Sequence, residues 1–199
     1  MTDDGPDVWE LRWIAARLPP LADAPAFSRA GGAALRVVEE QDVYLLTGSD
    51  NINLKIRHRG NALKLKRLTE RSADGFERWR TEFDAPLPAG RERFRIALNL
   101  LGKPGQEERL GLAASAGEAV ALLGGVCGKG QIVTVYKTRH LFQRGSCRLD
   151  IVRFRSKGGD YSSMGVESSA LDELRALAKE LDLGRLGTPR NYMEFLGAL

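Results

Sequence analysis

Residues 51–67 read NINLKIRHRGNALKLKR, and this stretch decides the fold class of the chain. From Ile52 to Ile56, apolar residues alternate with polar ones, which is the period of a β-strand with one buried face. Gly60-Asn61 is a turn signal, and the same alternation resumes from Leu63 to Leu65. The stretch therefore predicts an antiparallel hairpin with one apolar face and one basic face.

The basic face of this hairpin is rich in cations. Lys55, Arg57 and Arg59 alternate on the first predicted strand, and Lys64 and Lys66 on the second. Charge that alternates along one strand is usually the solvent face of a half-buried sheet. Solvent faces, however, usually mix both signs, and the whole stretch contains six Lys or Arg and no acid. If the sheet curls, these cations point into one cavity, where a multivalent anion would offset their repulsion.

A second basic region lies further along the chain. Residues 132–155 contain six Lys or Arg and one acid. Lys137 and Arg139 share a face of one predicted strand, 131–140, and Arg148 belongs to the next, 147–155. These side chains can join the same cavity.

Three acidic residues on predicted strands could hold a divalent cation, which prefers carboxylate ligands. They are Glu10, Asp150 and Glu167. The alternative is that each pairs with a nearby arginine. Asp150 shares its face with Val152, so a β-bulge would be needed to bring Asp150 and Arg153 into one cavity.

The other predicted strands and helices indicate the fold class. Further strands are predicted over residues 8–17, 35–46, 76–83 and 161–166, and helices over 91–101 and 113–123. Another helix is expected from a cap at Ser168 or Ser169 to about Leu181, and a short one from Thr188-Pro189 to Leu196. Hairpins followed by helices favour an antiparallel sheet in an α+β fold.

Composition sets the class of protein. The chain has 199 residues, 43% hydrophobic and 28% charged, with a net charge of +4. We expect one domain over residues 1–199. No apolar run approaches a membrane span and the first residues lack a signal-peptide pattern, so a cytoplasmic protein is expected. Two cysteines without a Cys/His cluster disfavour structural zinc. Nucleic acid is an unlikely partner because residues 51–67 contain no aromatic side chain for stacking.

The chain resembles the CYTH superfamily, the triphosphate tunnel metalloenzymes. Residues 8–13, VWELRW, resemble the family's N-terminal ExExK strand. Residues 41–45 resemble the segment leading into the basic hairpin, and 54–66 resemble the hairpin itself. Similar segments follow at 137–139, 148–150, 163–167 and 191–196. In the first motif, Val8 occupies an acidic position and Arg12 the lysine position, so Glu10 is the acid that remains.

The resemblance implies an eight-stranded antiparallel β tunnel that binds a triphosphate through Lys and Arg, with Mg²⁺ or Mn²⁺ held by carboxylates. The implied function is a phosphohydrolase acting on an inorganic or organic triphosphate or polyphosphate-like anion. The alternatives are a member that binds such ligands without turnover, or one of the adenylate cyclase type, and a homodimer is possible. The predicted metal ligands are Glu10, Asp150 and Glu167. The predicted anion-binding residues are Arg12, Lys55, Arg57, Arg59, Lys64, Lys66, Lys137, Arg139, Arg148 and Arg153.

Overall fold

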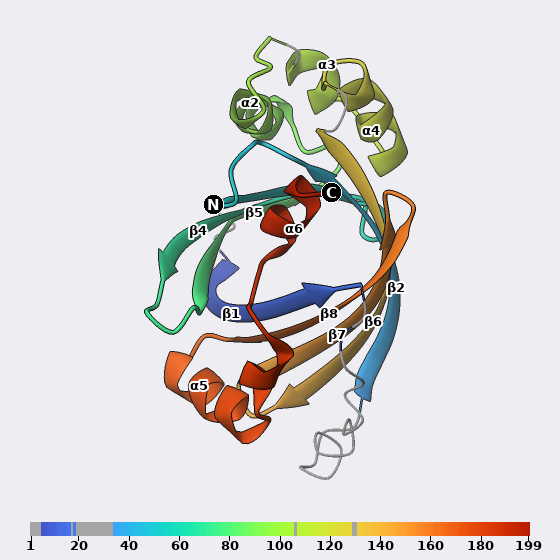
Figure 1. The fold of residues 1–199 in the computed structure, drawn as a ribbon. Coiled ribbons are helices and arrows are strands. Elements are labelled where there is room, and N and C mark those ends of the chain that lie inside the picture. The colour runs from blue at the N-terminus through green and yellow to red at the C-terminus, as the bar shows by residue number, and fades with distance from the viewer. Residues whose placement is uncertain (1–4, 17, 19–33, 106, 129–130) are drawn as a thin grey trace.

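The fold is a closed ring of antiparallel strands with helices on its outside and one helix in its interior (Figure 1). The structure is a computed structural model that describes residues 5–16, 18, 34–105, 107–128 and 131–199. Arg17, where the first predicted strand was expected to end, lies outside the described residues.

Eight strands form the barrel. They are β1 (Gly5–Ala15), β2 (Ala34–Leu45), β3 (Ile52–Arg57), β4 (Ala62–Arg71), β5 (Glu77–Pro86), β6 (Ile132–Arg144), β7 (Cys147–Ser156) and β8 (Gly159–Ser168). Their order around the barrel is β1-β5-β4-β3-β2-β6-β7-β8, and β8 pairs with β1 to close the ring. Every pair is antiparallel. The predicted α+β class and the eight-stranded tunnel are confirmed.

The hairpin read from residues 51–67 is β3–β4. Lys55 lies opposite Lys64, and Leu54 lies opposite Leu65, so each face of the hairpin has one chemical character. The turn includes Gly60, whose φ is +79°, a conformation that glycine adopts without steric cost. β3 ends at Arg57, two residues earlier than the alternation suggested.

Three helices cover the outside of the barrel over β2 to β5. They are α2 (Arg91–Leu100), α3 (Glu107–Gly111) and α4 (Ala116–Gly124). The apolar faces of β3 and β4 pack against them in one core cluster that includes Leu54, Leu63 and Phe94. The helices predicted at 91–101 and 113–123 are confirmed, whereas the short α3 was not predicted.

Two further helical segments cover the outside over β1, β7 and β8. They are α5 (Leu171–Glu180) and the 3-10 helix η1 (Leu183–Leu186). Leu174 and Leu177 pack there against Trp9, Trp13 and other strand residues. The predicted serine cap is wrong, because the N-cap position of α5 is an alanine without a side-chain hydrogen bond. None of the described helices has the length and apolar character needed to cross a membrane.

The last helix along the chain, α6 (Tyr192–Gly197), belongs to the interior of the barrel. Figure 1 shows the chain leaving η1 and crossing the ring of strands to reach it. Its residues Tyr192, Phe195 and Leu196 pack against inward-facing strand residues such as Val135 and Phe154. The helix begins after Asn191, whose side chain accepts hydrogen bonds from two backbone N–H groups, and not at Thr188-Pro189 as predicted.

A truncation of α6 tests this interior packing. Leu196 is fully buried, so Leu196→Ala should lower the free energy of unfolding by about 2–5 kcal/mol through lost contacts and a cavity. Leu112→Ala is the matched control because that leucine is 79% exposed and should change stability by less than about 0.5 kcal/mol. Urea denaturation measures both variants. Equal stability of the two would contradict the placement of α6.

Candidate anion-binding cavity

The interior of the barrel has an apolar part and a polar part. Along β6, Val133 and Val135 pack with α6, whereas Lys137 and Arg139 continue the same inward face into a cavity. The cavity volume is about 280 Å³. The apolar part closes around α6, and the polar part remains open for a ligand.

Cations predominate on the wall of this cavity. The described residues that line it include four carboxylates, Glu10, Glu40, Asp150 and Glu167. They also include nine cationic side chains, Arg12, Arg36, Lys55, Arg57, Lys64, Lys66, Lys137, Arg139 and Arg148. Nine cations against four carboxylates leave an excess of five positive charges. Asp42 and Asp84, which contact some of these cations, reduce the excess to three. A wall of this sign favours a multivalent anion.

Two predicted anion-binding residues lie elsewhere. Arg59 is exposed in the turn after β3. Arg153 is also exposed and lines a different hollow with Tyr136. β7 pairs with both neighbours without a register shift, so no bulge turns Arg153 toward Asp150. The expectation that Arg59 and Arg153 join the cavity is therefore wrong, while the other predicted residues all line it.

The structure adds residues that the pattern did not single out. Arg36, Glu40 and Tyr44 come from β2, Asn53 from β3 and Tyr192 from α6. The alternation of β2 contained a signal, because Glu40 and Tyr44 share one face. Nothing in the sequence pattern indicated that α6 would enter the barrel.

Two lysines share one buried aspartate. Asp42, 1% exposed, accepts hydrogen bonds from Lys55 at 2.7 Å and from Lys137 at 2.6 Å. Lys137 also donates to the Tyr44 hydroxyl at 2.7 Å. Burial alone would raise the pKa of Asp42, but the two ammonium groups outweigh it and hold the pKa well below its usual range.

Asp84 forms a second shared pair with Arg57 and Lys64. The distances to their terminal nitrogens are 2.5 Å and 2.8 Å. The Nε atom of Arg57 is buried and has no hydrogen-bond acceptor among the described residues. A buried donor without an acceptor costs free energy, so a bound anion would gain from meeting it.

Lys66 differs from the other lysines of the cavity. It forms no direct ion pair with any residue that the structure describes. Burial lowers its pKa, and the positive charges of Lys55, Arg12 and Arg148 lower it further against the opposing effect of Glu10. An anion in the cavity would therefore stabilise the charged form of Lys66.

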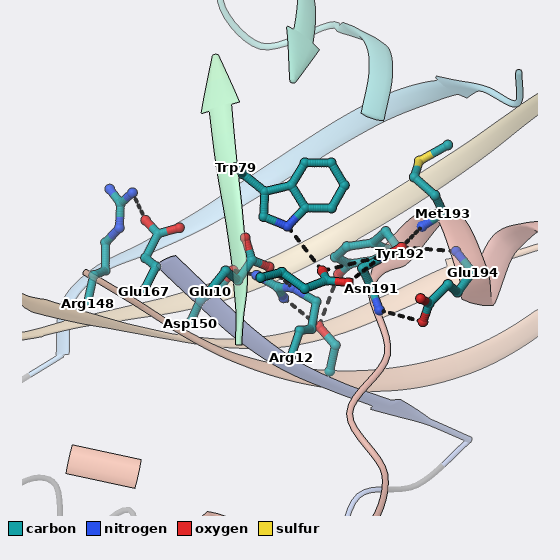
Figure 2. Close-up of polar contacts among 12 residues, drawn as sticks. Glu10, Arg12, Trp79, Arg148, Asp150, Glu167, Asn191, Tyr192, Met193 and Glu194 are labelled. Carbon is teal, nitrogen blue, oxygen red and sulfur yellow. Dashed lines mark hydrogen bonds and ion pairs between the residues drawn. The ribbon is translucent and has the colours of Figure 1, made fainter. Parts of the chain in front are cut away.

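Arg12 holds two of the predicted metal ligands. Its Nε lies 2.5 Å from Glu10 and its Nη2 lies 3.3 Å from Asp150. Figure 2 shows these three side chains together, with the ion pair between Arg148 and Glu167 further along the wall. All three predicted metal ligands are thus engaged by arginines.

These carboxylates do not form a metal site in this arrangement. Among the described residues, no group of three or more His, Cys, Asp or Glu side chains is placed to hold a metal ion. Asp150 also pairs with Arg139, at 2.7 Å. Because Arg remains protonated in proteins, these pairs engage both oxygens of Asp150 and one oxygen each of Glu10 and Glu167, and the residues in this arrangement do not fit a divalent cation.

Tyr192 of α6 closes one side of the cavity. Its ring stacks on Tyr44 with centroids 5.6 Å apart. Lys137 lies 4.6 Å and Arg12 5.0 Å from its ring centre. Its hydroxyl lies 3.0 Å from that of Ser163. The face of this ring attracts the two cations and fixes their position before any ligand binds.

Comparison with known proteins supports the fold. No protein-family model matches the sequence, and no curated protein does. Among solved structures, the PH1012 protein from Pyrococcus horikoshii OT3 aligns with a TM-score of 0.56 at 16% identity, covering 94% of this chain and 98% of its own. A conserved hypothetical protein from Pyrococcus furiosus aligns at 0.52 with 18% identity and the same coverage. A candidate adenylate cyclase from Bacillus halodurans aligns at 0.51 with 9% identity, covering 96% and 98%.

These neighbours are CYTH-like proteins with an eight-stranded antiparallel barrel, so the chain has the CYTH-like tunnel fold. The resemblance read from the sequence is confirmed at the level of the fold. At identities of 9–18%, the likeness extends to the fold alone. The chemistry has to be argued from the cavity of this chain.

Removing the shared aspartate tests the electrostatics of the cavity. Asp42→Asn leaves Lys55 and Lys137 without their counter-ion, and should lower the free energy of unfolding at pH 7 by about 3–5 kcal/mol. Because the pKa of Asp42 is lower in the folded chain, its contribution is present above the unfolded pKa of about 3.9 and is lost as the pH falls below it. Denaturant titration at several pH values measures both effects.

The matched control for that variant is Asp160→Asn. Asp160 pairs with Arg155 on the surface, where both side chains are at least 70% exposed, and the change should stay below about 1 kcal/mol. An Asp42 variant as stable as this control would show that the lysine pair does not depend on Asp42.

Proposed function

We propose that this chain binds a triphosphate or another polyphosphate-like anion in the basic cavity of its barrel. The observation that carries the proposal is the gathering of nine cations around one cavity, three more than the acids that line it or contact these cations can balance. Repulsion among these neighbouring cations raises the free energy of the empty site, and a ligand with several negative charges lowers it.

The positions of the unpaired donors support an anion with several phosphates. Lys66 lies opposite Asn53 across the β3–β4 pair, and Lys55 and Lys64 form the next inward-facing pair. Arg57 adds a free donor from the same strand as Lys55. Cations spaced along two strands match charges spaced along a phosphate chain better than one compact charge.

The size of the cavity supports a compact ligand. Its volume of about 280 Å³ lies near the lower end of small-molecule sites, which start at about 300 Å³. A nucleic-acid strand would need a longer groove with aromatic platforms. Tyr44 and Tyr192 stack on each other and present their rings to Lys137, so they do not offer such a platform.

Single substitutions of lining residues test the proposal. Lys66→Ala and Arg57→Ala should each weaken tripolyphosphate binding by roughly 10- to 100-fold, since a hydrogen bond to a charged group contributes about 1.5–3 kcal/mol. Isothermal titration calorimetry measures the affinity. Arg153→Ala is the control, because Arg153 is an exposed arginine outside the cavity and its loss should leave the affinity unchanged. Unchanged affinity in both lining variants would refute the assignment of the site.

A second candidate function is phosphohydrolysis of the bound anion with Mg²⁺ or Mn²⁺. The observation in its favour is that Glu10, Asp150 and Glu167 line the same cavity as the cations. The arginines that engage these carboxylates count against it. For this function the carboxylates would have to exchange an arginine for a metal ion when the anion binds.

A phosphate-release screen distinguishes the two functions. Tripolyphosphate, thiamine triphosphate and ATP would each be incubated with Mg²⁺ or Mn²⁺. Hydrolysis predicts released phosphate that disappears in Glu10→Gln and persists in Glu108→Gln, which alters an exposed glutamate of α3. An adenylate cyclase-type reaction would instead give pyrophosphate and a cyclic nucleotide from ATP. Absence of all products contradicts the second function and leaves anion binding intact.

A further inference from the structure

We propose that the cavity binds its anion without a divalent cation, because Arg12 serves as a built-in counter-ion for Glu10 and Asp150. The inference rests on the proposed anion-binding function and specifies what that function requires. It opposes the metal dependence that the resemblance implies.

The first argument is the position of Arg12 between two carboxylates. Its guanidinium is 8% exposed and contacts Glu10 through Nε and Asp150 through Nη2. The third nitrogen, Nη1, donates to Ser163 at 3.2 Å. All three nitrogens of the guanidinium are therefore engaged on the barrel wall. The guanidinium thus places a positive charge between the two carboxylates, and a metal ion would otherwise have to supply that charge.

The second argument is the gap in β8 that admits this guanidinium. Gly165 lies opposite Arg12 on one side and opposite Asp150 on the other. A Cβ atom at Gly165 would lie only 2.6 Å from Cζ of Arg12. The missing side chain lets Arg12 reach across β8 to an acid on β7. A glycine here is needed for close approach of a side chain, and its φ is not in the left-handed region.

The third argument is that the other acids of the cavity are neutralised in the same way. Arg139 contacts both Asp150 and Glu40, and Arg148 contacts Glu167. A guanidinium stays charged over the whole physiological pH range. Three fixed arginines therefore offset all but one of the four negative charges on these acids, which repel an incoming anion less than free carboxylates would.

The cations that remain are enough for an anion. Lys66 and Arg36 form no direct ion pair within the described part of the chain. Lys55 and Lys137 share a single aspartate, as do Arg57 and Lys64. The positive charge that attracts the ligand is thus present without metal.

The test compares tripolyphosphate affinity by calorimetry in EDTA and in excess Mg²⁺. We expect tripolyphosphate to bind in EDTA. Mg²⁺ should either change the dissociation constant by less than about threefold or weaken binding, because Mg²⁺ bound to the free ligand reduces its negative charge. Binding that is tighter with Mg²⁺ by more than roughly tenfold would overturn the inference. Absence of binding in both solutions would instead refute the anion-binding function itself.

Two variants test the role of Arg12. Gly165→Ala keeps the charge and displaces the guanidinium from Asp150, and Arg12→Gln removes the charge. In each we expect weaker binding in EDTA and recovery of roughly tenfold by Mg²⁺ or Mn²⁺, because Glu10 loses its arginine and Asp150 keeps Arg139 alone, which makes carboxylate oxygens available to metal. Gly117→Ala is the matched control, since a Cβ there meets open space. Circular dichroism and thermal melting establish folding.

A direct measurement of metal binding completes the test. Mn²⁺ added to the ligand-free chain should stay free in solution by electron paramagnetic resonance, and should bind to the folded Gly165→Ala variant. Mn²⁺ bound by the unaltered chain, or a Gly165→Ala variant that matches Gly117→Ala in both affinity and metal response, would overturn the role of Arg12.

Discussion

Repulsion between cations in a closed space is the constraint on which this structure depends. A barrel restricts the access of its inward-facing side chains to bulk water, so most of their charge must be balanced inside the ring. The chain meets this constraint by sharing: one aspartate serves two lysines, another serves an arginine and a lysine, and the arginines hold the remaining acids. Because each aspartate is shared by two cations, repulsion in the wall is reduced and the cavity still has a net positive charge.

The two kinds of cation have different positions in this arrangement. Arg12, Arg139 and Arg148 hold the glutamates and Asp150, because a planar guanidinium can contact several oxygens at once. Lysines face the cavity in larger number than their aspartates can balance, and Lys66 is the clearest case. A lysine responds to burial by a lowered pKa, whereas an arginine does not lose its proton. The cavity wall therefore combines arginines, whose charge is permanent, with lysines, whose protonation depends on whether an anion is bound.

The sequence predicted the barrel and most of the cavity wall because both follow from the alternation of apolar and polar residues along each strand. Residues 52–66 specify their faces without ambiguity, and the structure places them accordingly. Arg153 was assigned by its charge, although Val152 and Asp150 already indicated that it faces outward. Arg59 was assigned by continuing the alternation past the strand, where the turn ends it. The contribution of Tyr192 could not be predicted, since it depends on the tertiary path of α6 and not on local pattern.

The order of the elements along the chain constrains how the molecule is made. β1 has two neighbours, β5 and β8, and the second is synthesised only after all the other strands. The helix that fills the apolar half of the lumen follows still later. Until β8 and α6 have been synthesised, the growing chain can form hairpins, but it keeps an open sheet edge and an unfilled lumen.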